Sequence, residues 1–221
     1  MKFNGMCASM ARKKIYIISA VLFLLNLPLV NFDKPFSDWF HLAMVPWDFW
    51  LQKITYAGDG YVLAVLLIFL TTTLFLTGNR WWKTSGLALC SLALCALPTL
   101  LLKFTFGRPR PYVAGDTRIH GVDFTKFYWF EPNNDFRSLP SGHSAAIFAV
   151  AWLIVRHRNI HWIIRGLTIA SAFVVCLSRV ALAKHFFTDA AAGALVGVVA
   201  SEAIMDLSSH LHFPGRLGME L

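Results

Sequence analysis

Six apolar runs, separated by polar stretches, constrain what this chain can fold into. Each run is 14 to 18 residues long, and they cover residues 15–30, 61–78, 85–102, 142–155, 160–177 and 188–205. Several are shorter than the roughly 20 residues that a perpendicular membrane span needs, so flanking polar residues must be drawn in or the bilayer thinned locally. The pattern predicts an all-α polytopic membrane bundle of six transmembrane helices.

Composition supports a membrane protein and argues against a soluble nucleic-acid-binding one. The chain is 57% hydrophobic and 14% charged, whereas a soluble domain is about 45–50% apolar and about 25% charged. The net charge of +8 is read here as a mixture of topology signals and anion-binding side chains, so no nucleic-acid partner is expected. No internal repeat or composition break divides the chain, and residues 1–221 are predicted to form a single integral-membrane domain.

Two connections are longer than simple turns. Residues 31–60 interleave Trp and Phe with charges in "DKPFSDWFHLAMVPWDFW", which suits a short helix in the membrane interface, although a plain amphipathic linker is equally compatible. Residues 103–141 form a long polar loop between spans 3 and 4, and loops of that length are usually functional or disordered. Its aromatic stretch 124–136 suits either a lid or a packed loop, and "AGDG" at 57–60 reads as a turn on the same face that could help a lid.

Charge placement sets the expected orientation. The cluster Arg12-Lys13-Lys14 precedes the first run with no convincing cleavage site after it, which predicts an uncleaved first helix; translation from Met1 or from Met10 fits equally. With the N-terminus inside, Lys and Arg divide ten against ten. Three cations on the far side, Lys103, Arg110 and Arg179, are assigned below to anion binding. Without them the cytoplasmic side has ten Lys and Arg and the far side seven, which predicts a cytoplasmic N-terminus. The localisation expected is a bacterial cytoplasmic (inner) membrane.

Polar residues gather at the ends of the last four runs. Lys103 closes the third run and Arg179 the fifth, while Ser141-Gly142-His143 open the fourth, and His185 and Asp189 open the sixth. Because successive spans alternate in direction, all of these ends meet at one membrane face. Any one of these cations alone would be read as snorkelling to the interface. As a set of ionisable groups at span ends, they predict a functional site.

The cations and the helix start point to a phosphoryl group. Lys103, Arg110 and Arg179 supply one compact positive charge and two guanidinium forks, and forks of that kind bind phosphate oxygens in pairs. Ser141 is a suitable N-cap, and Gly142 lets a ligand approach the backbone. The free N–H groups of that helix start add an anion site aided by the helix dipole.

The histidines suggest which reaction the site could carry out. His185 and Asp189 are four residues apart and share a helix face, so the carboxylate can hold one ring nitrogen and leave the other as a nucleophile. His143 can protonate the leaving oxygen. No carboxylate-rich cluster surrounds them, so neither a metal nor another cofactor is expected. The structural interpretation is preferred for His41, His157, His161, His210 and His212, while His120 in the long loop is left open.

These residues together resemble a known family signature. Lys103 is followed after six residues by Arg110-Pro111; Pro140-Ser141-Gly142-His143 comes next; then Ser178-Arg179, five residues, His185, three residues and Asp189. This is similar to the three-part signature of the type 2 phosphatidic acid phosphatase and vanadium haloperoxidase superfamily. The signature covers residues 103–189, and the six apolar runs match the membrane lipid phosphatase branch rather than the soluble haloperoxidases.

The resemblance implies a metal-independent phosphatase that acts through a phosphohistidine at the outer membrane face. By position, His185 is the nucleophile, Asp189 orients it, and His143 is the general acid and then the base. Lys103, Arg110, Ser141, Gly142 and Arg179 would hold the phosphoryl group, with Arg108 as a supporting or headgroup contact. Candidate substrates are undecaprenyl diphosphate, phosphatidylglycerophosphate, phosphatidic acid and lipid A phosphate. A lipid phosphotransferase with the same site and a non-enzymatic lipid transporter are the alternatives.

Overall fold

The computed structural model describes residues 2–115, 121–157 and 159–210, so His120 and His212 lie outside the described residues. Within these ranges the regular structure is entirely helical, which confirms the all-α part of the predicted fold class. The α-helices are α1 (Lys2–Asn26), α2 (Val30–Met44), α3 (Asp48–Thr55), α4 (Gly60–Leu76), α5 (Trp82–Phe106), α6 (Gly142–Arg156), α7 (Trp162–Ala181) and α8 (Phe187–His210). Short 3-10 turns occur at η1 (Val45–Trp47), η2 (Tyr56–Gly58), η3 (Pro111–Gly115) and η4 (Asn134–Phe136).

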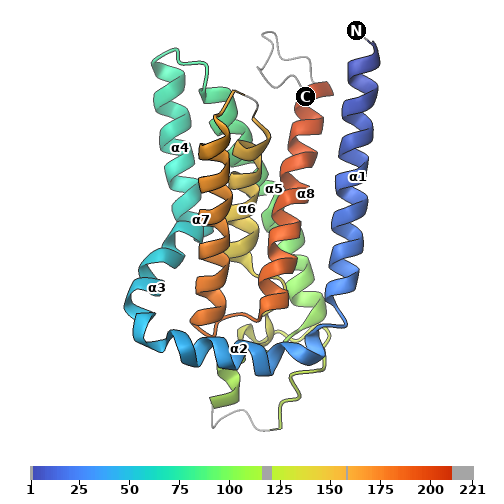
Figure 1. Cartoon of the computed structure of the whole chain (residues 1–221), viewed down its shortest axis with the longest axis vertical. Helices are drawn as coiled ribbons and strands as arrows, with labels where there is room; N and C mark the ends of the chain where they lie inside the picture. The colour runs from blue at the N-terminus through green and yellow to red at the C-terminus, as the bar shows by residue number, and fades with distance from the viewer. Residues whose placement is uncertain (1, 116–120, 158, 211–221) are drawn as a thin grey trace.

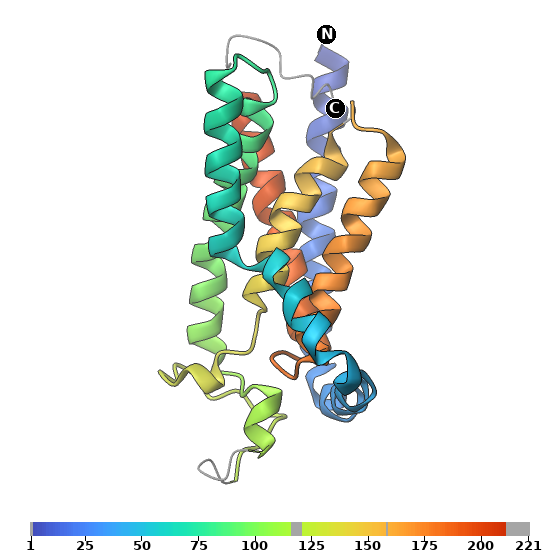
Figure 2. The same cartoon turned by 90° about the vertical axis from the view of Figure 1, so that its left-hand side faces the viewer.

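Most of each of the six apolar runs lies in one helix, and these six helices lie alongside one another (Figures 1 and 2). Three of them, α5, α7 and α8, are long and apolar enough to cross a membrane, and a fourth is added if α1 and the bent segment after it count as one span. Helices α4 and α6 have 17 and 15 residues, which gives about 25 and 22 Å of length against a hydrocarbon core of about 30 Å. Length and composition alone therefore support three or four spans, where the sequence predicts six.

Residues 31–60 form helices that cross one end of the bundle (Figure 1). The chain bends by 81° between Lys13–Asn26 and Val30–Gly58. Helix α2 is amphipathic: Asp33 and Ser37 are buried, whereas Phe36 and Trp39 are exposed. This arrangement agrees with the predicted interfacial helix better than with a plain linker.

Small residues hold α6 against α8 at the centre of the bundle. Ala145 and Ala149 of α6 are fully buried. A Cβ at Gly193 would lie 2.3 Å from the carbonyl oxygen of Ser141, and one at Gly197 would lie 2.3 Å from that of Ala145. Two glycines one turn apart thus let the backbones approach closely, as in other membrane helix pairs. The same contact fixes the start of α6 against α8.

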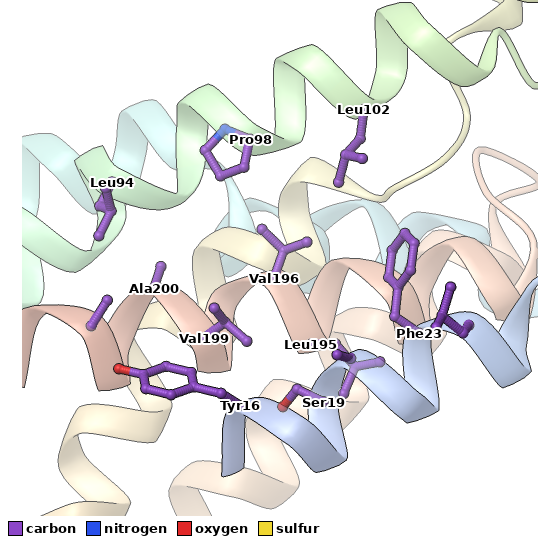
Figure 3. A pocket seen from close by; sticks show the side chains of 13 residues that line it. Tyr16, Ser19, Phe23, Leu94, Pro98, Leu102, Leu195, Val196, Val199 and Ala200 are labelled. Atoms are coloured by element: carbon purple, nitrogen blue, oxygen red, sulfur yellow. The ribbon is translucent and has the colours of Figure 1, made fainter. Parts of the chain in front are cut away.

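Helix α1 packs on α8 and leaves an apolar groove between itself and α5 (Figure 3). Tyr16 and Phe23 come from α1, and Leu94, Pro98 and Leu102 come from α5, while residues of α8 lie between them. The groove opens to the side of the bundle, and none of the predicted site residues lines it.

Candidate functional site

The predicted site residues lie at the end of the bundle that α2 crosses, where α5 and α7 end and α6 and α8 begin (Figure 1). The N–H of Ser141 donates a 2.9 Å hydrogen bond to the carbonyl oxygen of Asp189, which joins the starts of α6 and α8. A Cβ at Gly142 would lie 3.5 Å from Nζ of Lys103. Segments up to 86 residues apart in the sequence therefore meet at one place, as alternating spans require.

The start of α6 is built to present backbone N–H groups. Ser141 has extended backbone angles and its Oγ accepts from the N–H of Ser144, so it is the N-cap. The first N–H groups of a helix have no partner within the helix, and the dipole adds positive potential there. A Cβ added at Gly142 would be in van der Waals contact with the Lys103 ammonium, so the side-chain cation and the helix start lie close together.

Three further cations surround this point. Arg110 follows α5 and its main-chain N–H donates to the carbonyl oxygen of Asp135 at 2.8 Å. Arg179 lies in the last turn of α7, where Nη1 donates to Oγ1 of Thr55 at 2.9 Å. The charges of Arg110, Arg179 and Arg137 all act on Lys103. Arg137 is not among the site residues predicted from the sequence.

These cations repel one another, and their arginine side chains retain N–H groups that could donate hydrogen bonds to a ligand. The Nε–H groups of Arg110, Arg137 and Arg179 are buried and donate to no acceptor among the described residues. Buried donors without an acceptor are costly. Four positive charges with spare N–H groups around a helix start form an environment that a multiply charged anion would stabilise.

The imidazole of His185 lies in the loop between α7 and α8 and is buried. Its Nδ1 is 2.8 Å from the carbonyl oxygen of Ser138 and 3.9 Å from Oδ2 of Asp189. The hydrogen-bond acceptor for Nδ1–H is therefore Ser138, with the carboxylate alongside, whereas the sequence assigned this role to Asp189 alone. With the proton on Nδ1, the lone pair is on Nε2.

Burial keeps this ring uncharged. It lowers the pKa of His185 from its usual 6.5 to about 3, helped by the nearby Arg110 and Lys103 and opposed by Asp189. A neutral imidazole near pH 7 is the form that can act as a nucleophile.

Arg108 holds Asp189 in a buried network. Its Nη1 lies 2.6 Å from Oδ1 of Asp189 and 2.6 Å from Oγ1 of Thr188, and its Nη2 lies 3.1 Å from Oδ2 of Asp33. The guanidinium carbon lies 4.2 Å from the ring centroid of Phe186. Arg108 is fully buried, so the expectation of a headgroup contact is wrong: Gly107, in a left-handed conformation (φ +53°), turns the chain inward after α5.

His143 lies in the first turn of α6, and its nearest charged partner comes from an unexpected segment. Oδ2 of Asp59 lies 3.8 Å from its Nε2. Asp59 belongs to the "AGDG" stretch, for which the sequence predicts a turn. Its position just before an apolar helix start, as an N-cap, is the sequence signal that could have drawn attention to it.

The other described histidines make local structural contacts, including His210, whose Nε2 lies 3.7 Å from Oδ1 of Asp206. Nδ1 of His41 pairs with the carbonyl oxygen of Ala181, His157 stacks on Trp81, and the ring of His161 accepts from the N–H of Ile163. Across the described ranges, no group of three or more His, Cys, Asp or Glu side chains is placed to hold a metal ion.

The aromatic stretch 124–136 is partly packed and partly exposed. Phe127 and Trp129 contact Phe106 at the end of α5. The Trp129 and Phe130 side chains nevertheless remain more than half exposed. The stretch therefore packs against the end of α5 while part of its aromatic surface stays exposed. Its role as a lid stays a prediction.

Known proteins offer a family match and two similar structures. The family model described as "PAP2 superfamily" matches residues 84–211. The crystal structure of Aquifex aeolicus LpxE is similar with a TM-score of 0.60 and 25% sequence identity, over 79% of this chain and 95% of that one. The crystal structure of a transmembrane PAP2 type phosphatidylglycerolphosphate phosphatase from Bacillus subtilis is similar with a TM-score of 0.68 and 21% identity, over 90% of this chain and 98% of that one. Among curated protein sequences nothing matches.

Proposed function

The chain belongs to the PAP2 superfamily and is a lipid phosphatase, and from this premise we propose that it hydrolyses a membrane lipid phosphate or diphosphate through a phosphohistidine on His185. The observation that carries the proposal is the convergence of a buried neutral imidazole with several cations and the start of α6. The residues assigned to the phosphoryl group are Lys103, Arg110, Ser141, Gly142 and Arg179.

In the first step, Nε2 of His185 bonds to phosphorus and the bond to the lipid oxygen breaks. His143 gives its proton to that departing oxygen. The carbonyl oxygen of Ser138, with Asp189 beside it, keeps the Nδ1 proton in place and stabilises the positive charge on the phosphorylated ring. The cations lower the barrier by neutralising the equatorial phosphoryl oxygens.

In the second step, water attacks phosphorus and the bond to Nε2 of His185 breaks. The now neutral His143 takes a proton from that water. Inorganic phosphate leaves, and His185 returns to its neutral form with the proton still on Nδ1. No step requires a metal ion or another cofactor, because side-chain cations do the charge neutralisation.

The same proposal includes the membrane arrangement. All six long helices cross the bilayer, with α4 and α6 completed by flanking residues or by local thinning. The N-terminus is cytoplasmic, and the site faces the periplasmic or outer side. The exposed aromatics of α2, including Phe36 and Trp39, lie at the interface beside the site, where a lipid presents its phosphate.

The substrate class is a lipid with a terminal phosphate or diphosphate, and the panel to be tested keeps all four candidate lipids. The Bacillus subtilis neighbour is titled a phosphatidylglycerolphosphate phosphatase. That lipid, phosphatidic acid, undecaprenyl diphosphate and lipid A phosphate are the candidates.

The test is phosphate release by purified protein from each lipid in detergent micelles, with His185→Ala and His161→Ala in parallel. Release from at least one lipid, lost in His185→Ala and retained in His161→Ala, is expected. A wild-type protein that releases no phosphate from any of them, or His185→Ala with full activity, contradicts the proposal.

A further inference from the structure

A short segment that precedes α4 is pressed against the candidate site. Oγ1 of Thr55 accepts the hydrogen bond from Nη1 of Arg179. At Gly58, a Cβ would lie 2.4 Å from the Val175 side chain and 3.3 Å from the carbonyl oxygen of His143. Only a glycine allows this approach, so residues 55–60 pack directly on the ends of α6 and α7 that carry His143 and Arg179.

Asp59 lies at the end of this segment with its two carboxylate oxygens in different roles. Oδ1 accepts from the N–H groups of Tyr61 and Val62 at 2.9 and 3.1 Å, which caps α4. Oδ2 faces Nε2 of His143 at 3.8 Å. Because Oδ1 is held by the helix cap, the carboxylate of Asp59 cannot rotate freely. Its Oδ2 therefore stays directed toward the imidazole of His143.

We propose that Asp59 is the positioning residue for the general acid: it orients the ring of His143 and stabilises the proton that this ring carries. The inference rests on the proposed function and adds a residue outside the signature. When the bond between phosphorus and the lipid oxygen breaks, His143 hands its proton to that oxygen, and Asp59 keeps the ring aligned and lowers the cost of its carrying that proton. When water attacks the phosphohistidine, His143 takes up a proton and Asp59 again stabilises the resulting charge.

The surroundings of His143 are rich in positive charge. Arg179, Lys103 and Arg110 all act on its ring. Asp59 is the carboxylate that opposes them at that ring. At a few ångströms in a partly desolvated site, such an attraction is worth more than a surface ion pair.

A plain helix cap is the simpler role for Asp59, and Asp59→Asn separates the two. An asparagine at the N-cap keeps the acceptor for the α4 N–H groups but removes the charge that faces His143. Asp38→Asn is the matched control, since Asp38 is a half-exposed carboxylate on α2 at the same end of the molecule.

The decisive measurement compares two leaving groups by kcat/KM. An alkyl phosphate, such as dodecyl phosphate, needs a proton on its departing alcohol, whereas 4-nitrophenyl phosphate releases a stable phenolate with little need of one. We expect Asp59→Asn to lose roughly tenfold or more on the alkyl ester and much less on the nitrophenyl ester, because general acid catalysis contributes about 10²–10⁴-fold where it is needed. His143→Ala should show the same asymmetry. Adding Asp59→Asn to His143→Ala should lower kcat/KM little further.

Equal losses of kcat/KM on both esters would overturn the inference, because they would indicate a role through Arg179 or through folding instead. Wild-type behaviour of Asp59→Asn would overturn it too. Failure of the underlying function looks different: wild-type protein would then hydrolyse neither ester, or His185→Ala would remain active. Asp38→Asn should match wild type on both substrates.

Discussion

Nη1 of Arg108 lies 2.6 Å from Oδ1 of Asp189, and neither side chain reaches solvent. Through Nη2 the same guanidinium reaches Asp33 on α2. Asp189 also accepts from the Oγ of Ser138 and from the N–H of Phe186. One buried charge network thus ties α2, the loop after α5 and the start of α8 together beside His185, and it fixes the carboxylate that lies along that ring.

Replacing Arg108 by methionine is expected to destabilise the protein strongly. The substitution keeps much of the side-chain volume but leaves Asp33 and Asp189 buried without their cation, at a cost of roughly 3–5 kcal/mol. Thermal denaturation in detergent should show a clearly lower Tm, and phosphate release should fall with it. Lys126→Met, which removes an exposed cation paired with Asp123, should leave both values unchanged. A wild-type Tm for Arg108→Met would show that the network contributes little.

The partners of this network show what sequence reasoning can and cannot reach. Periodic apolar runs and alternating span direction predict which helix ends meet, and Lys103, His143 and His185 follow from that alone. Asp33 and Asp59 lie in segments before the third run, and their partners Arg108 and His143 are 75 and 84 residues further along the chain. A single carboxylate in a mixed polar segment carries no periodic signal, so such pairings become visible only when the tertiary packing is known.

For the helices too, the sequence predicts some features and leaves others open. The composition of residues 31–60 allowed both a helix and a linker, and burial of Asp33 against Arg108 accounts for the helix that forms. The span count depends on how α4 and α6 meet the bilayer, which apolar length alone does not determine.

Gly197→Ala is expected to separate α6 from α8. Its Cβ would lie 2.3 Å from the carbonyl oxygen of Ala145 and 2.7 Å from the N of Ala149, and both are backbone atoms that cannot move aside cheaply. Overpacking of this kind costs about 1–3 kcal/mol. Gly166→Ala on α7 is the control, because no atom lies within 4 Å of its Cβ position and alanine favours a helix. Thermal denaturation should show a lower Tm for the first variant only; equal values would mean that the two helices are not closely packed there.

Acidification should lower the stability of the folded protein, because the buried His185 is neutral in the fold and the unfolded chain binds its proton more readily. Its pKa is about 3 in the folded protein and 6.5 when unperturbed, so the unfolded chain binds more protons between these values and stability falls as the pH drops from 6.5 toward 3. From pH 6.5 to pH 5 the loss from this one group is about 2 kcal/mol. Denaturation of wild type and His185→Gln at pH 7.5 and pH 5 tests this: the variant should lose less stability on acidification. An equal loss in both proteins would show that His185 does not stay neutral in the fold.

Phosphate release should persist when divalent metal ions are removed. The proposed charge neutralisation comes from Lys103, Arg110 and Arg179 together with the start of α6, so an excess of EDTA should change kcat/KM little. The measurement is phosphate release with and without EDTA and added Mg²⁺, in detergent micelles to separate enzyme effects from effects on bilayers. Activity that appears only on adding Mg²⁺ would contradict the proposed chemistry.

Arg110→Lys should lower turnover although the charge is kept. A guanidinium can donate two parallel hydrogen bonds to phosphoryl oxygens, and an ammonium cannot reproduce that fork. The main chain of Arg110 is fixed by its 2.8 Å bond to Asp135, so a lysine cannot shift its backbone to compensate. We expect a loss of roughly tenfold or more in kcat/KM, with the Tm unchanged. Arg80→Lys, an exposed arginine in the α4–α5 turn at the other end of the bundle (Figure 1), should behave as wild type. Kinetics of Arg110→Lys that match wild type would remove Arg110 from the phosphoryl-binding set, whereas a lower Tm would assign it a structural role instead.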